Sequence, residues 1–521
     1  MSHPHEQTHE MDFLKTRVPK TLLLINMLLV VGYLYIVGFV LEVSNLYLFG
    51  ILIVGQIFYT LLGLAHLYTL WNMDYQLPLP PRARLFKPSV DVFITVAGEP
   101  VDIVEETARA AKAMDYSNFQ VYILNDGYVA KKDNWREIEE MAKRVGVYCI
   151  TRTTPGGAKA GNINNALAQT SGELVVIFDA DHVPHADFLQ KTVPYFARKS
   201  VGFVQSPQYY KNYKENTVAG GAWDQQKLYY GAICKGKNRL HAVTMCGTNM
   251  VIRREPLEAV GGMCSTNIAE DFITGMFIHE RGWKSVYVPE VLAEGLAPED
   301  FLSYYKQQHR WARGSLEVFW HFNPLFRRGL TIPQRLQYLS SSSYYMTGVI
   351  VVLNSLMPII FFFTGESIFT TSTMALAAAF LPYIFLTLYN LQRSSHFTYT
   401  FRALSFSMSS FPIHVKAFLE TIFGMKQGFA ITSKRKIEGT FIREVTPHIL
   451  YITLAAVGLG MGFIREGMTP SFITNAAWAL LNVAIFLPFI RCAMPSTSLA
   501  RSRIADLALP PLGRRRASPH S

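Results

Sequence analysis

The chain has 521 residues, of which half are apolar and only 17% are charged, and its formal net charge is +11. Ordinary soluble proteins carry roughly 25% charged residues, so this composition excludes an ordinary soluble protein and a disordered chain alike. Lysine and arginine gather beside the long apolar runs, and the positive-inside rule explains the net charge better than nucleic-acid binding does. The five cysteines show no CxxC pairing and no metal-ligand spacing, which fits a reducing compartment.

Two long apolar runs lie near the start of the chain. Residues 21–43 and 46–71 are each long enough to cross a hydrocarbon core of about 30 Å. The very short link between them predicts a hairpin that returns the chain to its starting side. A Pro-rich basic connector follows at residues 77–87. We therefore expect a cytoplasmic N-terminus and a transmembrane hairpin over residues 1–75.

Short apolar runs alternate with helical patterns over residues 89–205. Strands are expected at residues 90–96, 120–124, 147–150, 174–178 and 201–204, and helices at 101–114, 135–145, 159–169 and 186–198. This alternation predicts a parallel, doubly wound α/β sheet. Ligands of such sheets bind beyond the carboxyl ends of the strands. Asn125-Asp126-Gly127 and Asp179-Ala180-Asp181 each follow a predicted strand, so we expect a ligand site there.

Apolar runs resume at residues 344–364, 374–391, 448–463 and 472–490. Lysine and arginine are frequent between the second and third of these runs, whereas the links expected outside the cell carry only Arg465. This asymmetry predicts six spans, with both termini and both polar regions in the cytoplasm. The expected segments are a transmembrane pair over 336–391, an interfacial stretch over 392–446, and a second pair with a basic tail over 447–521.

Two motifs in the polar region have the chemistry of phosphate binding. Asp179 and Asp181 bracket one small residue after an apolar strand, where two carboxylates can hold a hard divalent ion that also ligates a diphosphate. Two solvated loop acids are the plainer alternative. Lys159 opens a predicted helix after a Gly-rich turn, which suits an anion site, although such a segment is often only a turn. Asp126 is either a turn residue or a hydrogen-bond partner of a base or ribose.

Two later motifs add a candidate base and a row of three ligand-binding side chains on one helix face, called the stripe below. Glu270 and Asp271 precede a helical run, where acids often serve only as caps. The functional alternative is a general base at Asp271, which typically contributes about 10²–10⁴ in rate. Gln307, Arg310 and Trp311 share one helix face and offer a sugar hydrogen bond, a cationic fork and a stacking surface. A membrane-surface helix marked by its tryptophan is the alternative.

In this order and spacing, the motifs resemble those of the processive family-2 membrane glycosyltransferases, specifically the cellulose synthase-like β-glycan synthases, over residues 88–440. Asp179 to His182 is similar to the family's metal motif, Cys246 and Gly247 to its acceptor-side loop, Glu270-Asp271 to its Thr-Glu-Asp motif, Gln307 to Trp311 to its Gln-x-x-Arg-Trp motif, and Phe429 to Lys434 to its gating loop.

The resemblance implies an inverting, metal-dependent hexosyltransferase. Its α/β doubly wound, GT-A-like nucleotide-sugar-binding domain, residues 76–335, would be inserted between all-α transmembrane segments. The implied site comprises Asp271 as catalytic base, Asp179 and Asp181 as ligands of Mg²⁺ or Mn²⁺, donor contacts from Glu99, Asp126, Lys159, Asp179, Gln307 and Arg310, acceptor contacts from Cys246, Gly247, Glu270 and Trp311, and gating-loop contacts from Phe429, Thr432 and Lys434.

The implied activity is processive synthesis of a β-linked glucan from UDP-glucose, with translocation of the polysaccharide across the plasma (inner) membrane and a cytoplasmic catalytic domain. Tyr338, Tyr344 and Tyr345 are candidates for lining a channel, with packing as the plainer alternative. The implied partners are the nucleotide sugar, the growing polysaccharide, the lipid bilayer and accessory export subunits, and no nucleic acid.

Four positions depart from the family pattern. Ala97 replaces the tyrosine expected to stack on uracil, Asn125 replaces an acid, Gly157 a histidine and Ala269 a threonine. The change at Ala97 weakens the expectation that the donor base is uridine. UDP-N-acetylglucosamine and GDP-mannose are the alternative donors. A non-catalytic membrane scaffold or transporter subunit is the alternative from a different class, and intact acids at positions 179, 181 and 271 argue against it.

Overall fold

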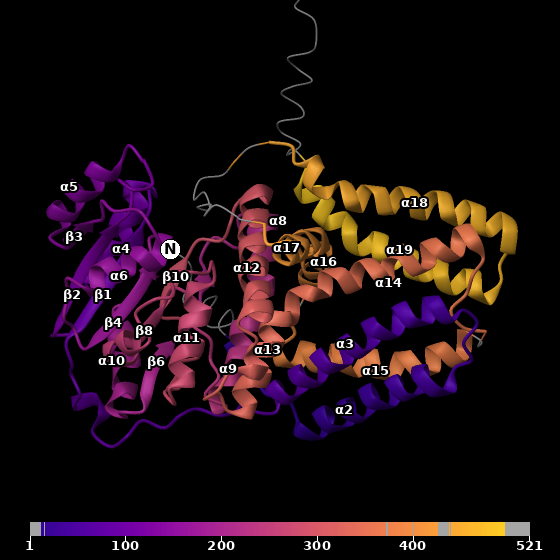
Figure 1. The fold of residues 1–521 in the computed structure, drawn as a ribbon, viewed down its shortest axis with the longest axis horizontal. Helices are drawn as coiled ribbons and strands as arrows, with labels where there is room; N and C mark the ends of the chain where they lie inside the picture. The colour runs from indigo at the N-terminus through magenta and orange to yellow at the C-terminus, as the bar shows by residue number, and fades with distance from the viewer. Residues whose placement is uncertain are drawn as a thin grey trace, which may run out of the picture.

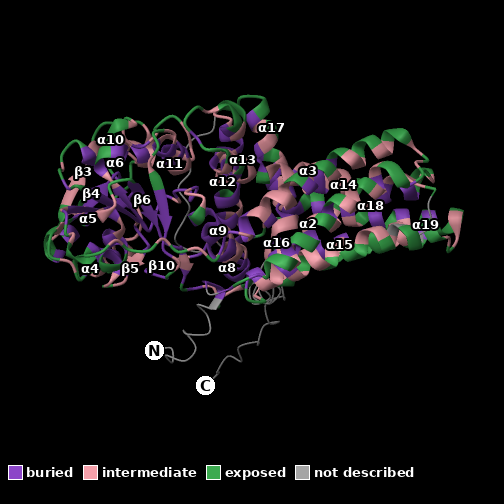
Figure 2. Cartoon of the chain, turned by 90° about the horizontal axis from the view of Figure 1, so that it is seen from below, coloured by how far each residue is buried: buried purple, intermediate pink, exposed green. Residues whose placement is uncertain are grey.

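The computed structural model describes residues 12–14, 16–370, 373–398, 400–425, 437 and 439–494. An α/β lobe and a bundle of long helices lie end to end along the longest axis of the molecule (Figure 1). The strands of the lobe are largely buried, whereas the long helices expose many side chains on their outer faces (Figure 2). The molecule therefore has one part built like a soluble domain and one part built for an apolar surrounding.

A seven-stranded sheet forms the centre of the lobe, in the order β3-β2-β1-β4-β8-β6-β9. Its strands are β1 (Val90–Val96), β2 (Phe119–Asn125), β3 (Tyr148–Thr151), β4 (Leu174–Asp179), β6 (Val201–Gln205), β8 (Met250–Arg253) and β9 (Lys284–Tyr287). Every residue of β1 is buried, as its unbroken apolar run predicts for a strand covered on both faces. All five strands expected from the sequence are present and run in one direction.

Strand β8 was not expected, and it runs antiparallel to both of its neighbours, β4 and β6. The sheet is therefore mixed, and the prediction of a wholly parallel sheet is wrong at this point. Because β8 runs the other way, its first residue lies beside the carboxyl end of β4, where Met250 pairs with Ile177. The loop that precedes β8 is thereby delivered to the edge of the sheet where ligands are expected.

Helices cover both faces of this sheet, as the alternating pattern predicts. They are α4 (Val101–Lys112), α5 (Trp135–Val145), α6 (Ala158–Leu167), α7 (Phe188–Thr192), α9 (Cys234–Arg239), α10 (Arg254–Ala259) and α11 (Glu270–Glu280), whereas α8 (Thr217–Leu228) packs on α16 (Phe401–Ser409). The helix expected over 186–198 is divided, because α7 gives way to a 3₁₀ turn at Pro194, which has no N–H to donate. A small second sheet joins β5 (Val183–Pro184), β10 (Ala293–Gly295) and β7 (Tyr209–Tyr210).

The helical bundle contains α2 (Lys20–Tyr35), α3 (Leu46–Leu70), α14 (Thr347–Thr364), α15 (Thr373–Ser394), α18 (Ile442–Glu466) and α19 (Pro470–Cys492), which lie side by side (Figure 1). Among the described residues, five helical stretches are long and apolar enough to cross a membrane: Lys20–Val40, Leu46–Leu70, Ile332–Thr364, Ile442–Glu466 and Pro470–Cys492. The sixth expected span, residues 374–391, lies on α15, and its role as a span stays a prediction.

Four helices connect the lobe to the bundle: α12 (Phe301–His321), α13 (Ile332–Ser343), α16 (Phe401–Ser409) and α17 (Phe411–Ile422). The expected interfacial stretch after residue 400 is two helices, α16 and α17, which meet at Ser410 and Pro412. Helix α16 packs closely on α8 because Gly221 has no side chain; a Cβ there would lie 2.5 Å from the Phe406 ring. These contacts fix the lobe against the membrane helices.

Candidate active site

Acidic residues from two strands meet at one edge of the larger sheet. Thr95 of β1 pairs with Leu124 of β2 on one side and with Asp179 of β4 on the other. Asp126 directly follows β2, and Asp181 follows β4 after one residue. The two acidic motifs therefore lie together at the carboxyl ends of adjoining strands, where the topology places ligand sites.

Asp179, Asp181 and His182 form a cluster suited to a metal ion. One ligand atom from each residue lies within 4.8 Å of the others. Nδ1 of His182 is 3.5 Å from Oδ1 of Asp181, and the N–H of Leu296 donates to Oδ2 of Asp181 at 3.2 Å. Gly295 leaves room for the imidazole, since a Cβ there would lie 2.5 Å from its Nε2. Two carboxylates and an imidazole fit Mg²⁺ or Mn²⁺. The metal motif predicted from the sequence includes His182, but only Asp179 and Asp181 were named as ligands.

Lys159 connects this cluster with the loop before β8. Its ammonium forms an ion pair with Asp179 and donates a 2.8 Å hydrogen bond to the Gly247 carbonyl oxygen. Burial lowers the pKa of Lys159, but the carboxylates of Asp179, Glu270 and Asp271 together raise this pKa above its ordinary value. Lys159 is therefore a fixed positive charge in the middle of the site.

Asp126 is held by an arginine that the sequence analysis missed. Arg152 donates from Nε to Oδ1 of Asp126 and from Nη2 to Oδ2, both at 2.7 Å. The same guanidinium also donates to the carbonyl oxygens of Gly156 and Ala158, in the turn before Lys159. Arg152 directly follows β3 at the same edge of the sheet, and this position was the signal that could have revealed it. Asp126 is thus buried and oriented before any ligand binds.

Glu270 and Asp271 begin helix α11 and face the cavity. Oδ1 of Asp271 accepts a 2.7 Å hydrogen bond from the N–H of Phe272. Burial, followed by the charge of Asp271, raises the pKa of Glu270 to about 7, and burial likewise raises the pKa of Asp271. Gly247 approaches this pair closely at φ +78°, because a Cβ there would lie 2.9 Å from Oδ2 of Asp271. A carboxylate with a raised pKa accepts a proton more readily near neutral pH.

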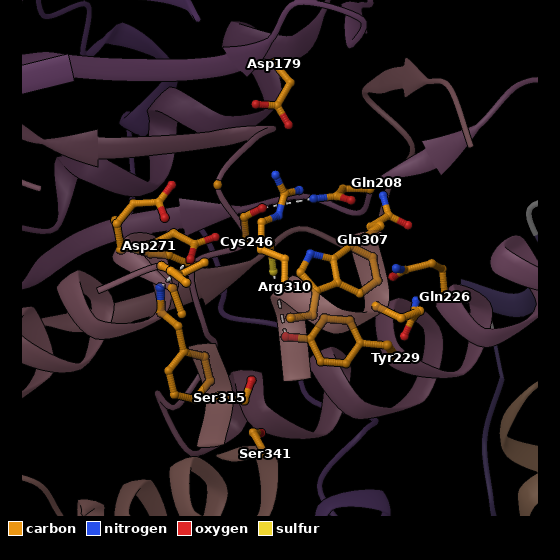
Figure 3. Close-up of a pocket in the computed structure, with 18 of the residues that line it drawn as sticks. Asp179, Gln208, Gln226, Tyr229, Cys246, Asp271, Gln307, Arg310, Ser315 and Ser341 are labelled. Carbon is orange, nitrogen blue, oxygen red and sulfur yellow. Dashed lines mark hydrogen bonds between the residues drawn. The ribbon is translucent and has the colours of Figure 1, made fainter. Parts of the chain in front are cut away.

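Gln307, Arg310 and Trp311 of α12 all line the same cavity (Figure 3). The helix begins at the cap Asp300, whose carboxylate accepts from the N–H of Ser303 at 2.8 Å. One turn beyond the stripe, Gly314 packs against the residue before Glu270. Helix α12 also packs along α17, and the alternative of a membrane-surface helix stays open.

Cys246 lies opposite this stripe and is fixed by amide side chains. Its N–H donates to Oε1 of Gln205 at 3.0 Å, and its carbonyl oxygen accepts from Nε2 of Gln208 at 3.0 Å. The Tyr229 hydroxyl lies 3.7 Å from the sulfur. Burial and the charge of Asp271 raise the pKa of the Cys246 thiol to about 11. The thiol is therefore protonated at neutral pH and is a surface for contact, since only a thiolate is nucleophilic.

Every candidate site residue that the structure describes lines one cavity of about 1180 Å³: Glu99, Asp126, Lys159, Asp179, Asp181, Cys246, Gly247, Glu270, Asp271, Gln307, Arg310 and Trp311. Tyr344 and Tyr345 line it as well. Tyr338 packs in the core instead, where its hydroxyl lies 2.8 Å from Nδ1 of His279, so the packing alternative holds for this residue. Phe429, Thr432 and Lys434 lie outside the described residues.

The cavity also extends past the lobe into the membrane part. Its lining includes Tyr59 and His66 of α3 and Tyr383 of α15, together with serine side chains such as Ser341. In Figure 3, Asp179 and Ser341 lie at opposite sides of this pocket, with Cys246 and Tyr229 between them. The acidic cluster and the membrane helices therefore share one continuous space.

Fold and site together define a GT-A-type glycosyltransferase domain joined to membrane helices. A mannosyltransferase from Pyrobaculum calidifontis, solved in complex with GDP-Man and Mn²⁺, has this fold. It matches with a TM-score of 0.51 and 17% sequence identity, over 72% of this chain and 99% of its own. The family model described as "Glycosyltransferase like family 2" matches residues 88–314, and the model "Cellulose synthase" matches residues 253–441. The chain therefore carries a family 2 glycosyltransferase domain and a cellulose synthase domain.

Curated relatives agree with these two domain matches. A cellulose synthase catalytic subunit (UDP-forming) from Komagataeibacter sucrofermentans is 30% identical over 438 residues, which cover 80% of this chain and 57% of the relative. A cellulose synthase catalytic subunit (UDP-forming) from Xanthomonas axonopodis pv. citri is 35% identical over 323 residues, which cover 60% of this chain and 42% of the relative. The chain thus spans about half the length of these relatives.

Proposed function

We propose that this protein is a membrane-embedded, inverting, processive glycosyltransferase that polymerises a β-linked glucan from UDP-glucose and translocates it across the membrane. The observation that carries the proposal is the single cavity that joins the acidic cluster, the Glu270–Asp271 pair and the stripe of α12 to the membrane helices. Five apolar helices indicate an integral membrane protein. We infer that it lies in the plasma (inner) membrane with the lobe in the cytoplasm, where nucleotide sugars are made.

In the proposed reaction, the carboxylate of Asp271 takes the proton from an acceptor hydroxyl. The hydroxyl oxygen forms a bond to the anomeric carbon of the donor, on the face opposite the diphosphate, while the bond from that carbon to the diphosphate oxygen breaks. Lys159 and Arg310 offset the charge that develops on the departing nucleoside diphosphate. The proton ends on Asp271, and the configuration at the anomeric carbon is inverted.

Asp179, Asp181 and His182 would hold the divalent ion that this reaction requires. When bound, Mg²⁺ or Mn²⁺ supplies positive charge for the oxygens of the diphosphate. Lys159 forms an ion pair with Asp179, and both side chains line the cavity. We propose that Asp126 and Glu99 contact the nucleoside, and that the Arg152 fork holds Asp126 in place for that contact.

The acceptor would occupy the side of the cavity between Trp311 and Cys246. Trp311 offers an apolar face for a pyranose ring, and the backbone at Gly247 leaves space next to Asp271. Beyond them, the tyrosines and serines of α3, α13 and α15 give the cavity a polar lining inside the membrane part. Such a lining suits a glycan, whose hydroxyls need hydrogen-bond partners away from water. Accessory export subunits would take the chain beyond the membrane.

We propose UDP-glucose as the donor because both curated relatives named above are described as UDP-forming cellulose synthases. To test the choice, membranes containing the protein receive labelled UDP-glucose with Mg²⁺ or Mn²⁺, and the product is digested with linkage-specific glucanases. The expected result is a high-mass product that one glucanase dissolves. UDP-N-acetylglucosamine and GDP-mannose are run in parallel, and polymer from either of these alone would overturn the glucose assignment.

Asp271→Asn is the variant that separates an enzyme from a scaffold. We expect it to lower sugar transfer by about 10²–10⁴, as typical for loss of a general base, while membrane insertion and donor binding remain normal. Glu255→Gln, an exposed acid on α10, serves as the matched control and keeps full activity. Unchanged transfer in Asp271→Asn would contradict the assigned role.

A further inference from the structure

A buried lysine lies in the part of the cavity away from the acidic cluster. The Lys237 side chain is only 1% exposed and lines the cavity. Its Nζ donates a 2.7 Å hydrogen bond to Oγ of Ser341 and lies 5.7 Å from the centre of the Tyr229 ring. Figure 3 places Ser341 across the cavity from Asp179. The proposed transfer reaction leaves Lys237 without a role.

No carboxylate among the described residues forms an ion pair with Lys237, in contrast to Lys159, which pairs with Asp179. The groups whose negative charge would act on the pKa of Lys237 are the thiols of Cys234 and Cys246, and burial raises the pKa of both thiols, so that they are protonated at neutral pH. Burial also lowers the pKa of Lys237. An ammonium out of contact with water is costly unless an anion compensates it, and this wall of the cavity supplies none.

A second polar group that lines the cavity lacks a hydrogen-bond partner among the described residues. Nε2 of His66, on α3, is buried and forms no hydrogen bond with the described residues. Helices α3 and α9 touch backbone to backbone, because a Cβ on Gly236 would overlap the carbonyl oxygen of Thr69. His66 precedes Thr69 by about one helical turn, and Lys237 directly follows Gly236. Both residues therefore lie close in the chain to this backbone contact, and both line the cavity.

We propose that Lys237 and His66 form a subsite for an anionic group, a carboxylate or a phosphate, carried by the acceptor or the growing glycan. The proposal rests on the proposed function, since the cavity must accept a glycan. Both side chains can donate to the oxygens of one anion, and charge-assisted hydrogen bonds are the stronger kind. A neutral hydroxyl needs only a serine or glutamine, which cost less to bury. A carboxylate would belong to a uronate residue, which would require a nucleotide-uronate donor beside UDP-glucose, and a phosphate would belong to a lipid-linked acceptor.

The test measures binding to the purified full-length protein without any nucleotide sugar, so that no turnover occurs. One pair of probes is cellotetraose and the same tetramer with every C6 oxidised to a carboxylate; the other is a polyprenyl monophosphate and its polyprenol. We expect wild type to bind the anionic member of one pair about tenfold more tightly than its neutral partner. Lys237→Met removes this preference, and His66→Leu weakens it.

Lys235→Met is the matched control. Lys235 is a buried lysine of the same helix, but its Nζ donates to the carbonyl oxygen of Thr16 at 3.0 Å and it does not line the cavity. This variant keeps the preference for the anion. A preference for the oxidised tetramer identifies a uronate-bearing chain, and a preference for the polyprenyl phosphate identifies a lipid-linked acceptor.

Equal affinity for both members of both pairs in wild type would overturn the subsite, as would a preference that survives Lys237→Met. Failure of the proposed function has a different signature, namely no polymer from any nucleotide sugar in the transfer assay. Because the binding measurement requires no donor, the two failures are distinguishable.

Discussion

Glu270 and Asp271 are neighbours in the chain and in the cavity, and their shared burial determines how the activity responds to pH. The raised pKa values, about 7 for Glu270, mean that the pair takes up a proton as the pH falls through neutrality. Protonation removes the base, so we expect kcat/KM to fall on the acidic side, with an apparent pKa well above that of an ordinary aspartate. The measurement is kcat/KM for the donor between pH 5 and 9.

Glu270→Gln tests whether the coupled acids cause this acidic limb. The substitution removes one negative charge beside Asp271, which makes the Asp271 carboxylate easier to keep ionised. We therefore expect the acidic limb to move to lower pH, whatever happens to the maximal rate. An acidic limb that stays in place would assign it to a different group, such as the phosphates of the donor.

Arg152 lines the cavity and holds both Asp126 and the turn before Lys159, so we expect it to position the donor-binding residues. Arg152→Lys keeps the charge but loses the paired donors, so we expect the KM for the nucleotide sugar to rise by about tenfold with a smaller change in kcat. Arg254→Lys is the matched control, because Arg254 holds Asp91 at 2.7 Å near the amino end of β1, away from the cavity. It should lower thermal stability and leave the KM unchanged. Equal KM effects in both variants would contradict the positioning role.

At the scale of elements, apolar periodicity was enough to predict the parallel strands. It did not predict the antiparallel strand β8, whose preceding loop completes the site. The run from Val90 to Val96 is a strand with the predicted bounds, and the acids after β2 and β4 lie at the predicted edge. Strand β8 has only four residues and follows two helices in the chain. It therefore does not continue the alternation of strands and helices that predicted the other strands. Lys237 likewise carries no local signal of its contact with Ser341, which lies 104 residues further along the chain.

The contact of α9 with α3 gives a prediction at this scale. Gly236→Ala would push a methyl group into the Thr69 carbonyl oxygen, and overpacking of this kind costs about 1–3 kcal/mol. We expect a lower midpoint of thermal unfolding in detergent. Gly460→Ala is the control, because this helical glycine of α18 has no atom within 4 Å of its added Cβ and alanine favours a helix. Equal midpoints in the two variants would show that the contact is not tight.

At the scale of the whole molecule, the charge distribution predicts which parts face the cytoplasm. Met468 is 68% exposed in the short link between α18 and α19, and Asp133 is exposed on the lobe. We expect Met468→Cys to react with a membrane-impermeant maleimide added to intact cells, and Asp133→Cys to react only after permeabilisation. Labelling of the unsubstituted protein measures the background reaction of its own cysteines with the maleimide. The reverse pattern of labelling would invert the proposed orientation.

The backbone contact between Gly236 and Thr69 also makes lipid a determinant of the cavity's shape. Helix α3 has 25 residues and is about 37 Å long at 1.5 Å per residue, which exceeds a hydrocarbon core of about 30 Å. A helix longer than the bilayer accommodates by tilting, and a thinner bilayer demands a larger tilt. Since α9 rests directly on the end of α3, a change of tilt is transmitted to the wall that holds Lys237 and Tyr229. The thickness of the host membrane thus affects the geometry of the cavity wall next to the acceptor site.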